Sequence, residues 1–211
     1  MQQALAAARP PSWRGPARGA AVGAVAICFP RGLSGPGAAG DPAWAAAVVM
    51  RGRRTLAEAV VTGAAAAPYV PGLLAMREGP LLEAAVRALD VVPDVLLVDA
   101  TGRDHPRRAG LALHLGAVLE LPTVGVTHRP LVATGDWPGP EKGATAPLTL
   151  DGDEVGAWLR RRANARPVAV HPAWRTSIDV AVAVVRDAAG THRTPEPLRR
   201  ARRLARLARA S

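Results

Sequence analysis

Cysteine is almost absent: Cys28 is the single thiol among 211 residues. One cysteine excludes an intramolecular disulfide framework and a zinc site built from several thiolates. Aromatic residues are also scarce, with five Trp, one Tyr and one Phe. Apolar runs stay short of the ~18 residues that a membrane-spanning helix needs, so no membrane association is expected.

Lysine is missing from most of the chain, since Lys142 is the only lysine among 27 basic residues. Acidic residues number 17, and the formal net charge is +10. Positive charge favours polyanionic partners. The bias towards Ala, Arg, Gly and Pro is equally expected of a GC-rich genome, so charge alone indicates nucleic-acid binding only weakly.

A chain of this length suits one domain with a substantial core. Residues 1–18 are rich in Ala, Pro and Arg without periodicity, which predicts a mobile tail ahead of a domain over residues 19–211. A transit or signal peptide has a similar composition. We favour the tail, because Ala20–Phe29 is needed as a strand and no convincing cleavage site follows it.

The stretch from residue 94 to 131 organises the chain. Val95–Val98 is an apolar run of strand length, and it ends on Asp99. Asp104 stands where a helix N-cap belongs, with Pro106 just inside the expected helix. Apolar residues then recur at helical spacing before the next strand, Thr123–Val126. This order predicts a right-handed βαβ unit with parallel strands.

An acid at a strand tip, beside a helix start that carries Arg107 and Arg108, is a plausible place for a metal ion and a phosphate. The alternative is that Asp99 is simply a solvated residue that ends a strand. Spacing alone does not choose between these two interpretations.

The flanking segments predict the rest of the sheet and a basic C-terminal helix. Ala20–Phe29, Trp44–Met50 and Thr55–Thr62 are expected strands, which gives an α/β sheet with an antiparallel portion. Residues 195–209 predict an amphipathic helix, with six arginines in Leu198–Arg209. We rank a docked helix first, a phosphate-contacting arm second and a membrane-surface helix third.

Four motifs in order carry a family resemblance. They are DATGRDHPRRAGLALHLG with LPTVGVTH after it, Pro68–Gly72 with Arg77-Glu78, Arg175-Thr176-Ser177, and Pro195-Glu196-Pro197. Together they resemble the endonuclease V family, nucleases that act on deoxyinosine, over about residues 20 to 200. The resemblance implies a ribonuclease H-like mixed sheet flanked by helices in a single domain.

The resemblance changes how individual residues are interpreted. On its own, the stiff loop Pro68–Gly72 is more simply a packed surface loop with Tyr69 half-buried; in the family it is the wedge that opens the duplex. Glu78 would otherwise be a dipole partner of an expected helix, Leu81–Leu89. The resemblance makes Glu78 and Asp99 catalytic ligands of Mg²⁺ or Mn²⁺, and it places His128 among the catalytic residues. It implies substrate contacts from Tyr69, Pro71, Gly72, Thr101, Gly102, His105 and Arg107.

The chain departs from the family pattern at four positions. Val25 stands where the first strand normally carries an Asp, and Trp174 stands where a catalytic His is usual. His128 replaces a usual Lys, and Thr101 replaces a usual His. His171 is three residues before Trp174, but on an extended segment it would face the opposite way.

The resemblance implies metal-dependent hydrolysis of the phosphodiester 3′ to deoxyinosine in deaminated DNA, and Val25 and Trp174 imply impaired activity. The alternative is a homologue that binds deaminated or distorted nucleic acid without cleaving it. A third interpretation is a degenerate chain kept for protein contacts, against which the wedge and Asp99 argue. The expected partners are DNA containing deoxyinosine and also inosine-containing RNA. We expect a cytoplasmic monomer.

Overall fold

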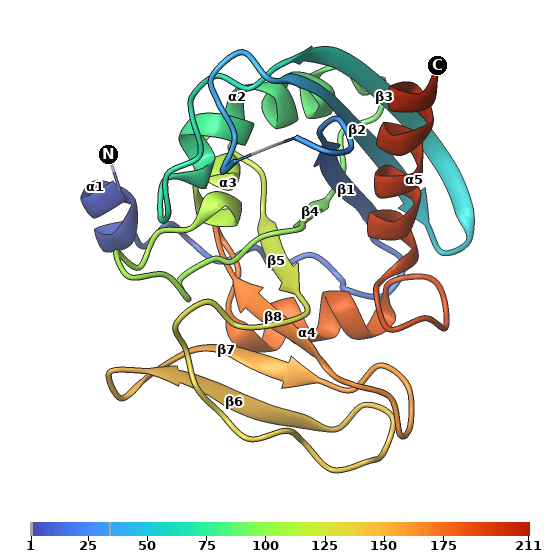
Figure 1. The fold of residues 1–211 in the computed structure, drawn as a ribbon. Coiled ribbons are helices and arrows are strands. Elements are labelled where there is room, and N and C mark those ends of the chain that lie inside the picture. The colour runs from blue at the N-terminus through green and yellow to red at the C-terminus, as the bar shows by residue number, and fades with distance from the viewer. Residues whose placement is uncertain (1, 34) are drawn as a thin grey trace.

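Eight strands form one sheet within residues 2–33 and 35–211, the part of the chain that the computed structural model describes (Figure 1). The strands are β1 Ala21–Cys28, β2 Pro42–Arg51, β3 Arg54–Ala64, β4 Val95–Val98, β5 Thr123–Thr127, β6 Thr145–Leu150, β7 Asp153–Leu159 and β8 Val168–Pro172. The helices are α1 Gln2–Ala7, α2 Leu74–Arg87, α3 Leu111–Leu119, α4 Ile178–Asp187 and α5 Glu196–Ala210. None of these helices is both long and apolar enough to cross a membrane.

The sheet is mixed, with the strand order β3-β2-β1-β4-β5-β8-β7-β6. β4 pairs in parallel with β1 on one side and β5 on the other. The remaining neighbours are antiparallel. The predicted α/β class, with parallel central strands and an antiparallel portion in a single domain, is therefore confirmed.

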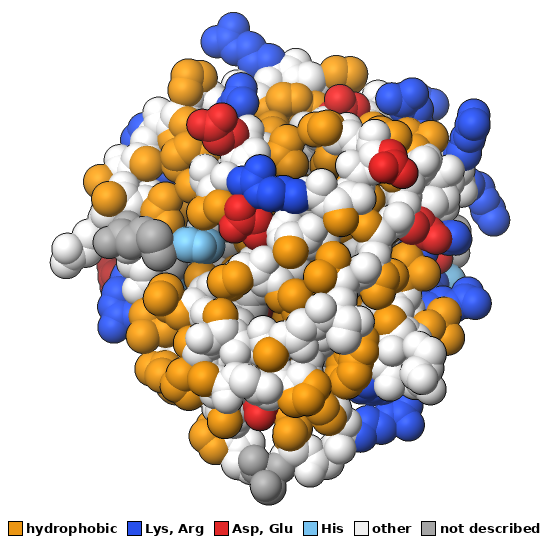
Figure 2. All heavy atoms as spheres, turned by 90° about the horizontal axis from the view of Figure 1, so that it is seen from above, with side chains coloured by type: hydrophobic (Ala, Val, Ile, Leu, Met, Phe, Trp, Pro, Cys, Tyr) orange, Lys and Arg blue, Asp and Glu red, His pale blue; other side chains and the backbone are white. Residues whose placement is uncertain are grey.

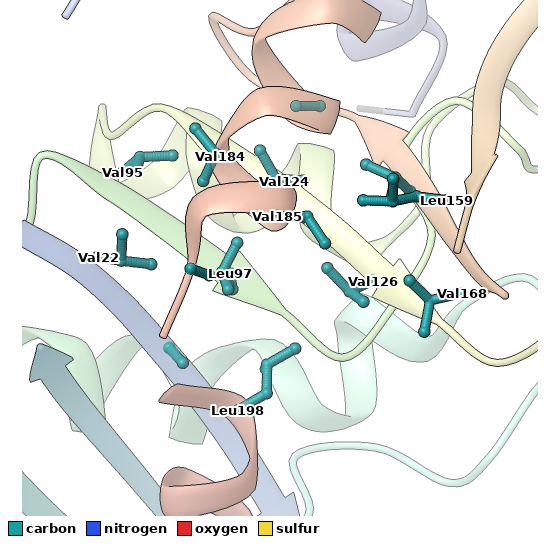
Figure 3. Packing of buried hydrophobic residues seen from close by; sticks show 14 of the residues in the cluster. Val22, Val95, Leu97, Val124, Val126, Leu159, Val168, Val184, Val185 and Leu198 are labelled. Carbon is teal, nitrogen blue, oxygen red and sulfur yellow. The ribbon is translucent and has the colours of Figure 1, made fainter. Parts of the chain in front are cut away.

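Helices cover both faces of the central strands. All four residues of β4 are apolar, and both faces of the strand are buried. Val95 and Leu97 pack with α4 and α5, and Figure 3 shows them beside Val184, Val185 and Leu198. Leu96 and Val98 point the other way and pack with α2 and α3. Successive side chains of a strand point to opposite faces of the sheet, so the four apolar residues of β4 are divided between two cores.

Two predicted helix starts are wrong. Asp104 is not an N-cap, since α3 begins only at Leu111. Its carboxylate is fully buried and accepts hydrogen bonds from the backbone N–H groups of residues 131, 132 and 133, at 2.7, 2.9 and 2.7 Å. The other helix, α2, begins at Leu74 rather than Leu81 and contains Pro80. Burial of Arg77, Gly79 and Leu82 along it outweighs the helix-breaking tendency of Gly79-Pro80.

Residues 2–18 also differ from the expected mobile tail. Gln2–Ala7 forms the helix α1, and Arg103 donates hydrogen bonds to the carbonyls of Ala6 and Ala8 at 2.8 and 2.9 Å. The backbone N–H of Trp13 donates to the carbonyl of Arg175 at 2.6 Å. The N-terminal segment therefore lies against the domain, with α1 next to α3 (Figure 1).

Asp104→Ala is expected to lower the free energy of unfolding by about 3 kcal/mol or more, because three backbone donors lose a buried, charged acceptor. Asp104→Asn should cost less, since it keeps one carbonyl oxygen. Urea unfolding measures both. The control Asp187→Ala removes an exposed carboxylate and should stay within about 0.5 kcal/mol of the unmodified chain. An Asp104→Ala value within that same margin would contradict the structural role.

Candidate functional site

Two carboxylates meet at the carboxyl end of β4. Asp99 directly follows that strand, and Glu78 lies on α2, which covers the same end. Both line a cavity of about 230 Å³, named here the carboxylate cavity. Its lining consists of Val25, Ala26, Ile27, Phe29, Leu74, Glu78, Leu82, Val98, Asp99 and Leu111. Glu78 is therefore held among apolar side chains, while Asp99 lies at the solvent-exposed border of the cavity.

The environment of Glu78 favours its neutral form. Burial raises the pKa of Glu78 to about 7, while the nearby Arg77 charge opposes the rise and the Asp99 charge adds to it. A carboxyl group in this state gains from any cation that enters beside it, because the cation stabilises the ionised form. Glu78 is thus suited to hold a positive charge shared with Asp99.

Asp99 already has a cationic partner in the protein. Arg202 of α5 forms a two-pronged ion pair with it, in which Nε lies 2.8 Å from Oδ2 and Nη2 lies 2.6 Å from Oδ1. This fork geometry is the strong form of the Arg–carboxylate contact. Both oxygens of Asp99 are engaged, so a metal ion that binds Asp99 must compete with Arg202.

The carboxylate cavity contains no third acid. Val25 lies on β1 directly opposite Val98 of β4, and its side chain is buried. In the described residues, no group of three or more His, Cys, Asp or Glu side chains could hold a metal ion. Two carboxylates fit one hard cation completed by water and phosphate oxygens. They do not fit a pair of metal ions, which needs more converging oxygens.

A second cavity, of about 270 Å³, adjoins the first at Asp99 and is named here the loop cavity. It is lined by Gln2, Tyr69, Gly72, Leu74, Ala75, Asp99, Ala100, Thr101, His105, Ala109, Gly110, Leu111, Thr127, Arg129, Pro130 and Leu131. Four predicted substrate-binding residues therefore surround one hollow: Tyr69, Gly72, Thr101 and His105. Asp99 belongs to both linings, so the two cavities share a carboxylate.

Local conformation explains two of these residues. Gly72 has a φ of 78°, a left-handed value that side chains disfavour, and it lets the loop turn back towards His105. His105 is buried, and its Nδ1 accepts a hydrogen bond from the backbone N–H of Arg107 at 3.1 Å. Burial lowers the pKa of His105. The ring is therefore held by this hydrogen bond as part of the wall of the loop cavity.

The other predicted substrate-binding residues lie outside the cavity lining. Pro71 is exposed beside Gly72. A Cβ at Gly102 would lie 2.2 Å from the carbonyl oxygen of Pro172, so this glycine serves close packing. Arg107 donates from Nη1 to Oε1 of Gln2 at 3.1 Å and thus contacts a residue of the lining.

His128 lies on the α5 side of the site, outside both cavity linings. Its Nε2 forms a hydrogen bond with Oγ1 of Thr194 at 2.9 Å. Burial lowers the pKa of His128; Arg193 and Arg202 add to this effect, and Asp99 opposes it. The charge of Asp99 thus reaches His128, although the ring is bonded elsewhere.

The resemblance implies a catalytic His at position 174; Trp174 occupies that position, and the side chain of His171 is bonded elsewhere. His171 is completely buried, with Nε2 bonded to Oγ1 of Thr127 at 2.9 Å and Nδ1 3.8 Å from Oδ2 of Asp104. Burial lowers the pKa of His171 to about 4, although Asp104 opposes the change. Trp174 packs on the core cluster that includes Val25, and its Cβ approaches Gly116.

Two residues at the site were not predicted from the sequence. Gln2 and Arg202 reach it from opposite ends of the chain, and Arg202 is separated by 103 residues from Asp99. The arginine-rich sequence of α5 indicated positive charge in general, but nothing in the spacing of its arginines identified Arg202 as the partner of Asp99. Figure 2 shows one face of the molecule, where charged side chains of both signs stand among apolar ones.

Comparison with known proteins gives a consistent result. A family model described as Endonuclease V matches residues 22–203. Endonuclease V of Alkalilimnicola ehrlichii is 45% identical over 163 residues, which cover 76% of this chain and 72% of that protein. Endonuclease V of Streptomyces avermitilis is 42% identical over 170 residues, which cover 80% of this chain and 74% of that protein.

Solved structures agree with these matches. The S. avermitilis crystal structure has a TM-score of 0.89 and 37% identity, over 99% of this chain and 90% of that one. The catalytic domain of human Endonuclease V has a TM-score of 0.85 and 29% identity, over 98% and 92%. Ciona intestinalis Endonuclease V, solved with a 24mer DNA containing an inosine followed by a ribo-adenosine, shares the fold with a TM-score of 0.77 and 21% identity, over 100% and 96%.

His171 predicts a pH dependence of stability. Its folded pKa of about 4 lies below the usual value of 6.5, so between these values the unfolded chain binds more protons. Stability should therefore fall as the pH drops from 6.5 to 4, by about 3 kcal/mol at the limit. Urea unfolding across this range should show a shallower fall for His171→Gln. The exposed His192→Gln is the control and should keep the full slope; equal slopes for both variants would contradict this account.

Proposed function

The chain belongs to the endonuclease V family, and on that premise we propose that it recognises deoxyinosine in deaminated DNA and hydrolyses the phosphodiester on its 3′ side at a reduced rate. The observation that carries this proposal is the position of Asp99 on the border of two cavities. One cavity has room for an extruded base and a wedge residue at its wall, and the other holds the second carboxylate. A base in the first cavity would bring its own phosphate towards the acids of the second.

The loop residues support base recognition. Tyr69 is 42% exposed and lines the loop cavity, so its ring is free to stack on a base left unpaired. Thr101 and the backbone near Gly72 and Gly110 offer polar groups inside the hollow. The wall formed by residues 129–131 is held in place by the Asp104 carboxylate. Recognition thus depends on backbone groups fixed by buried contacts.

The family acts with a metal ion, and we propose Mg²⁺ or Mn²⁺ for this chain. Asp99 and Glu78 would hold it, and the ion would activate water and stabilise the leaving oxygen. Arg202 and His128 lie on the α5 side of Asp99 and would supply contacts to phosphate once Asp99 is engaged elsewhere. Inosine-containing RNA as a second substrate, a monomeric state and a cytoplasmic location remain predictions.

A second candidate function is binding without cleavage. Two observations favour it: Val25 supplies no oxygen ligand, and Arg202 occupies both oxygens of Asp99. In such a protein the guanidinium would neutralise Asp99, and the wedge and loop cavity would still read the base. Cleavage and metal-binding measurements distinguish the two functions.

The unmodified chain is expected to cleave inosine-containing DNA very slowly or not at all with Mg²⁺, and Mn²⁺ should rescue at most a trace. One positioned acid–base group is worth about 10²- to 10⁴-fold, so Trp174 alone accounts for a loss of that size. The double variant Val25→Asp with Trp174→His should restore measurable single-turnover cleavage.

The matched control is Val25→Asn with Trp174→His, which has the same shape without the added charge and should stay inactive. Urea unfolding of both variants establishes that they fold, because Trp174 packs on the core. Brisk cleavage by the unmodified chain that survives Asp99→Ala would overturn the assignment of the site. Brisk cleavage abolished by Asp99→Ala would show that another group replaces the missing carboxylate.

Arg202→Ala should tighten Mn²⁺ binding several-fold, to about 10-fold at most, because it frees both oxygens of Asp99. Arg203→Ala is the control, since it removes an equal charge from an exposed position on the same helix. Calorimetric titration with Mn²⁺ measures both. If the two variants gain equally, the effect is a general one of net charge and the ion pair does not control the site.

A further inference from the structure

The side chain of Gln2 reaches into the lining of the loop cavity from the N-terminal helix. Its Nε2 donates hydrogen bonds to the carbonyls of Gly72 at 2.9 Å and Ala109 at 3.2 Å. Its Oε1 accepts from Nη1 of Arg107 at 3.1 Å. These partners are separated from Gln2 by 70, 107 and 105 residues. The carboxamide thus uses both protons and its oxygen on groups at the predicted base site.

This hydrogen-bond pattern matches one edge of a particular class of base. Hypoxanthine, the base of deoxyinosine, has a lactam edge in which the N1–H donor stands beside the O6 acceptor. A carboxamide presents the same adjacent N–H donor and C=O acceptor. Adenine lacks this pattern, because its N1 is an acceptor and its exocyclic N6 is a donor. Gln2 uses a second N–H that a lactam edge does not have, so one of the two carbonyls together with the Arg107 donor is suited to satisfy a lactam edge.

The helix that carries Gln2 is weakly attached. α1 spans only Gln2–Ala7 and has no buried residue. Its main polar anchors are the Gln2 contacts themselves and the two hydrogen bonds from Arg103 to its last turn and the residue after it. Leu5 and Ala6 pack only at the margin of the core. Withdrawal of Gln2 would therefore disturb little of the sheet.

We propose that Gln2 is an internal mimic of the lactam edge, and that an extruded base must displace it to reach the carbonyls of Gly72 and Ala109. The inference rests on the proposed function, because it takes the loop cavity as the base site. A base recovers most of this cost only if its edge offers a donor to one of these carbonyls and an acceptor to Arg107, as N1–H and O6 of a lactam do. Gln2 then sets a cost that every entering base must meet, and a base that lacks the donor–acceptor pair recovers less of it.

Affinity measurements with Gln2→Ala and Gln2→Met test this inference. The methionine keeps the length of the side chain but makes no comparable hydrogen bond. The control is Gln3→Ala on the same helix, where the side chain is exposed. Binding is measured by fluorescence anisotropy, in EDTA to prevent cleavage, on otherwise identical duplexes that carry inosine, guanine or adenine at one position. Tyr69→Ala, measured alongside, tests the wedge independently of Gln2.

Both Gln2 variants should bind the inosine duplex about 3- to 10-fold more tightly than the unmodified chain, because a competing set of hydrogen bonds is gone. A base that must displace Gln2 should gain by a similar factor whatever its edge, so the preference for inosine over adenine should stay nearly unchanged. Gln3→Ala should leave all three affinities unchanged.

Three other outcomes would overturn the inference. Weaker inosine binding by both Gln2 variants would mean that Gln2 contacts the base as a partner. Unchanged inosine affinity in both Gln2 variants, with a loss in Tyr69→Ala, would remove the role of Gln2 and leave the proposed function intact. No preference for inosine in any chain, the Gln2 variants included, would remove the proposed function and the inference together.

Discussion

Strand β4 is covered on both faces, and this two-sided burial determines where the functional side chains lie. Its four residues are divided between the core under α4 and α5 and the core under α2 and α3. A polar residue has no place until the strand ends, and the first one is Asp99. In a sheet with parallel strands, the carboxyl ends are where loops gather and ligands bind. Glu78, the loop of residues 68–72 and Arg202 of α5 all lie around that end.

Charge is distributed unevenly around the carboxyl end of β4. The chain has an excess of ten positive charges, yet the site holds two acids, one of them surrounded by apolar side chains. Arg77 and Arg202 approach them from opposite layers of the fold, one on α2 and one on α5. Val25, on the strand beside β4, adds no negative charge to the two acids. A site of this composition is better prepared to receive a phosphate than to gather several metal ions.

The sequence predicted those features that depend on local pattern. Val95–Val98 followed by Asp99 was predicted with its observed bounds, because a short apolar run that ends on an acid is a local signal. The resemblance placed Tyr69, Gly72, Thr101 and His105 in the substrate site, and the structure brings them around one cavity. The assignment of these residues to substrate binding remains a prediction.

Contacts between segments that are far apart in the chain could not be predicted from local sequence patterns. Asp104 has the composition of an N-cap, yet its partners are three N–H groups more than 25 residues away. The pair Gly79-Pro80 predicts the end or start of a helix, yet α2 continues through it because residues on both sides of the pair are buried. Gln2 and Arg202 belong to segments that composition describes only as a tail and a basic helix. Their side chains gain a role only when the fold brings them to the loop cavity and to Asp99.

Pro80 divides α2 into two parts with different attachments. Proline has no N–H, so the carbonyl of Met76 has no donor at the position one turn later. Behind it, Leu82, Ala85 and Val86 are fixed to the sheet. Ahead of it, Arg77 is bonded to the carbonyls of Ala38 and Ala67, which belong to loops. Contacts of Arg77 with two loops therefore hold the turn that carries Glu78 where the helix lacks this hydrogen bond, so the position of one of the two site carboxylates depends on those loops as well as on the helix.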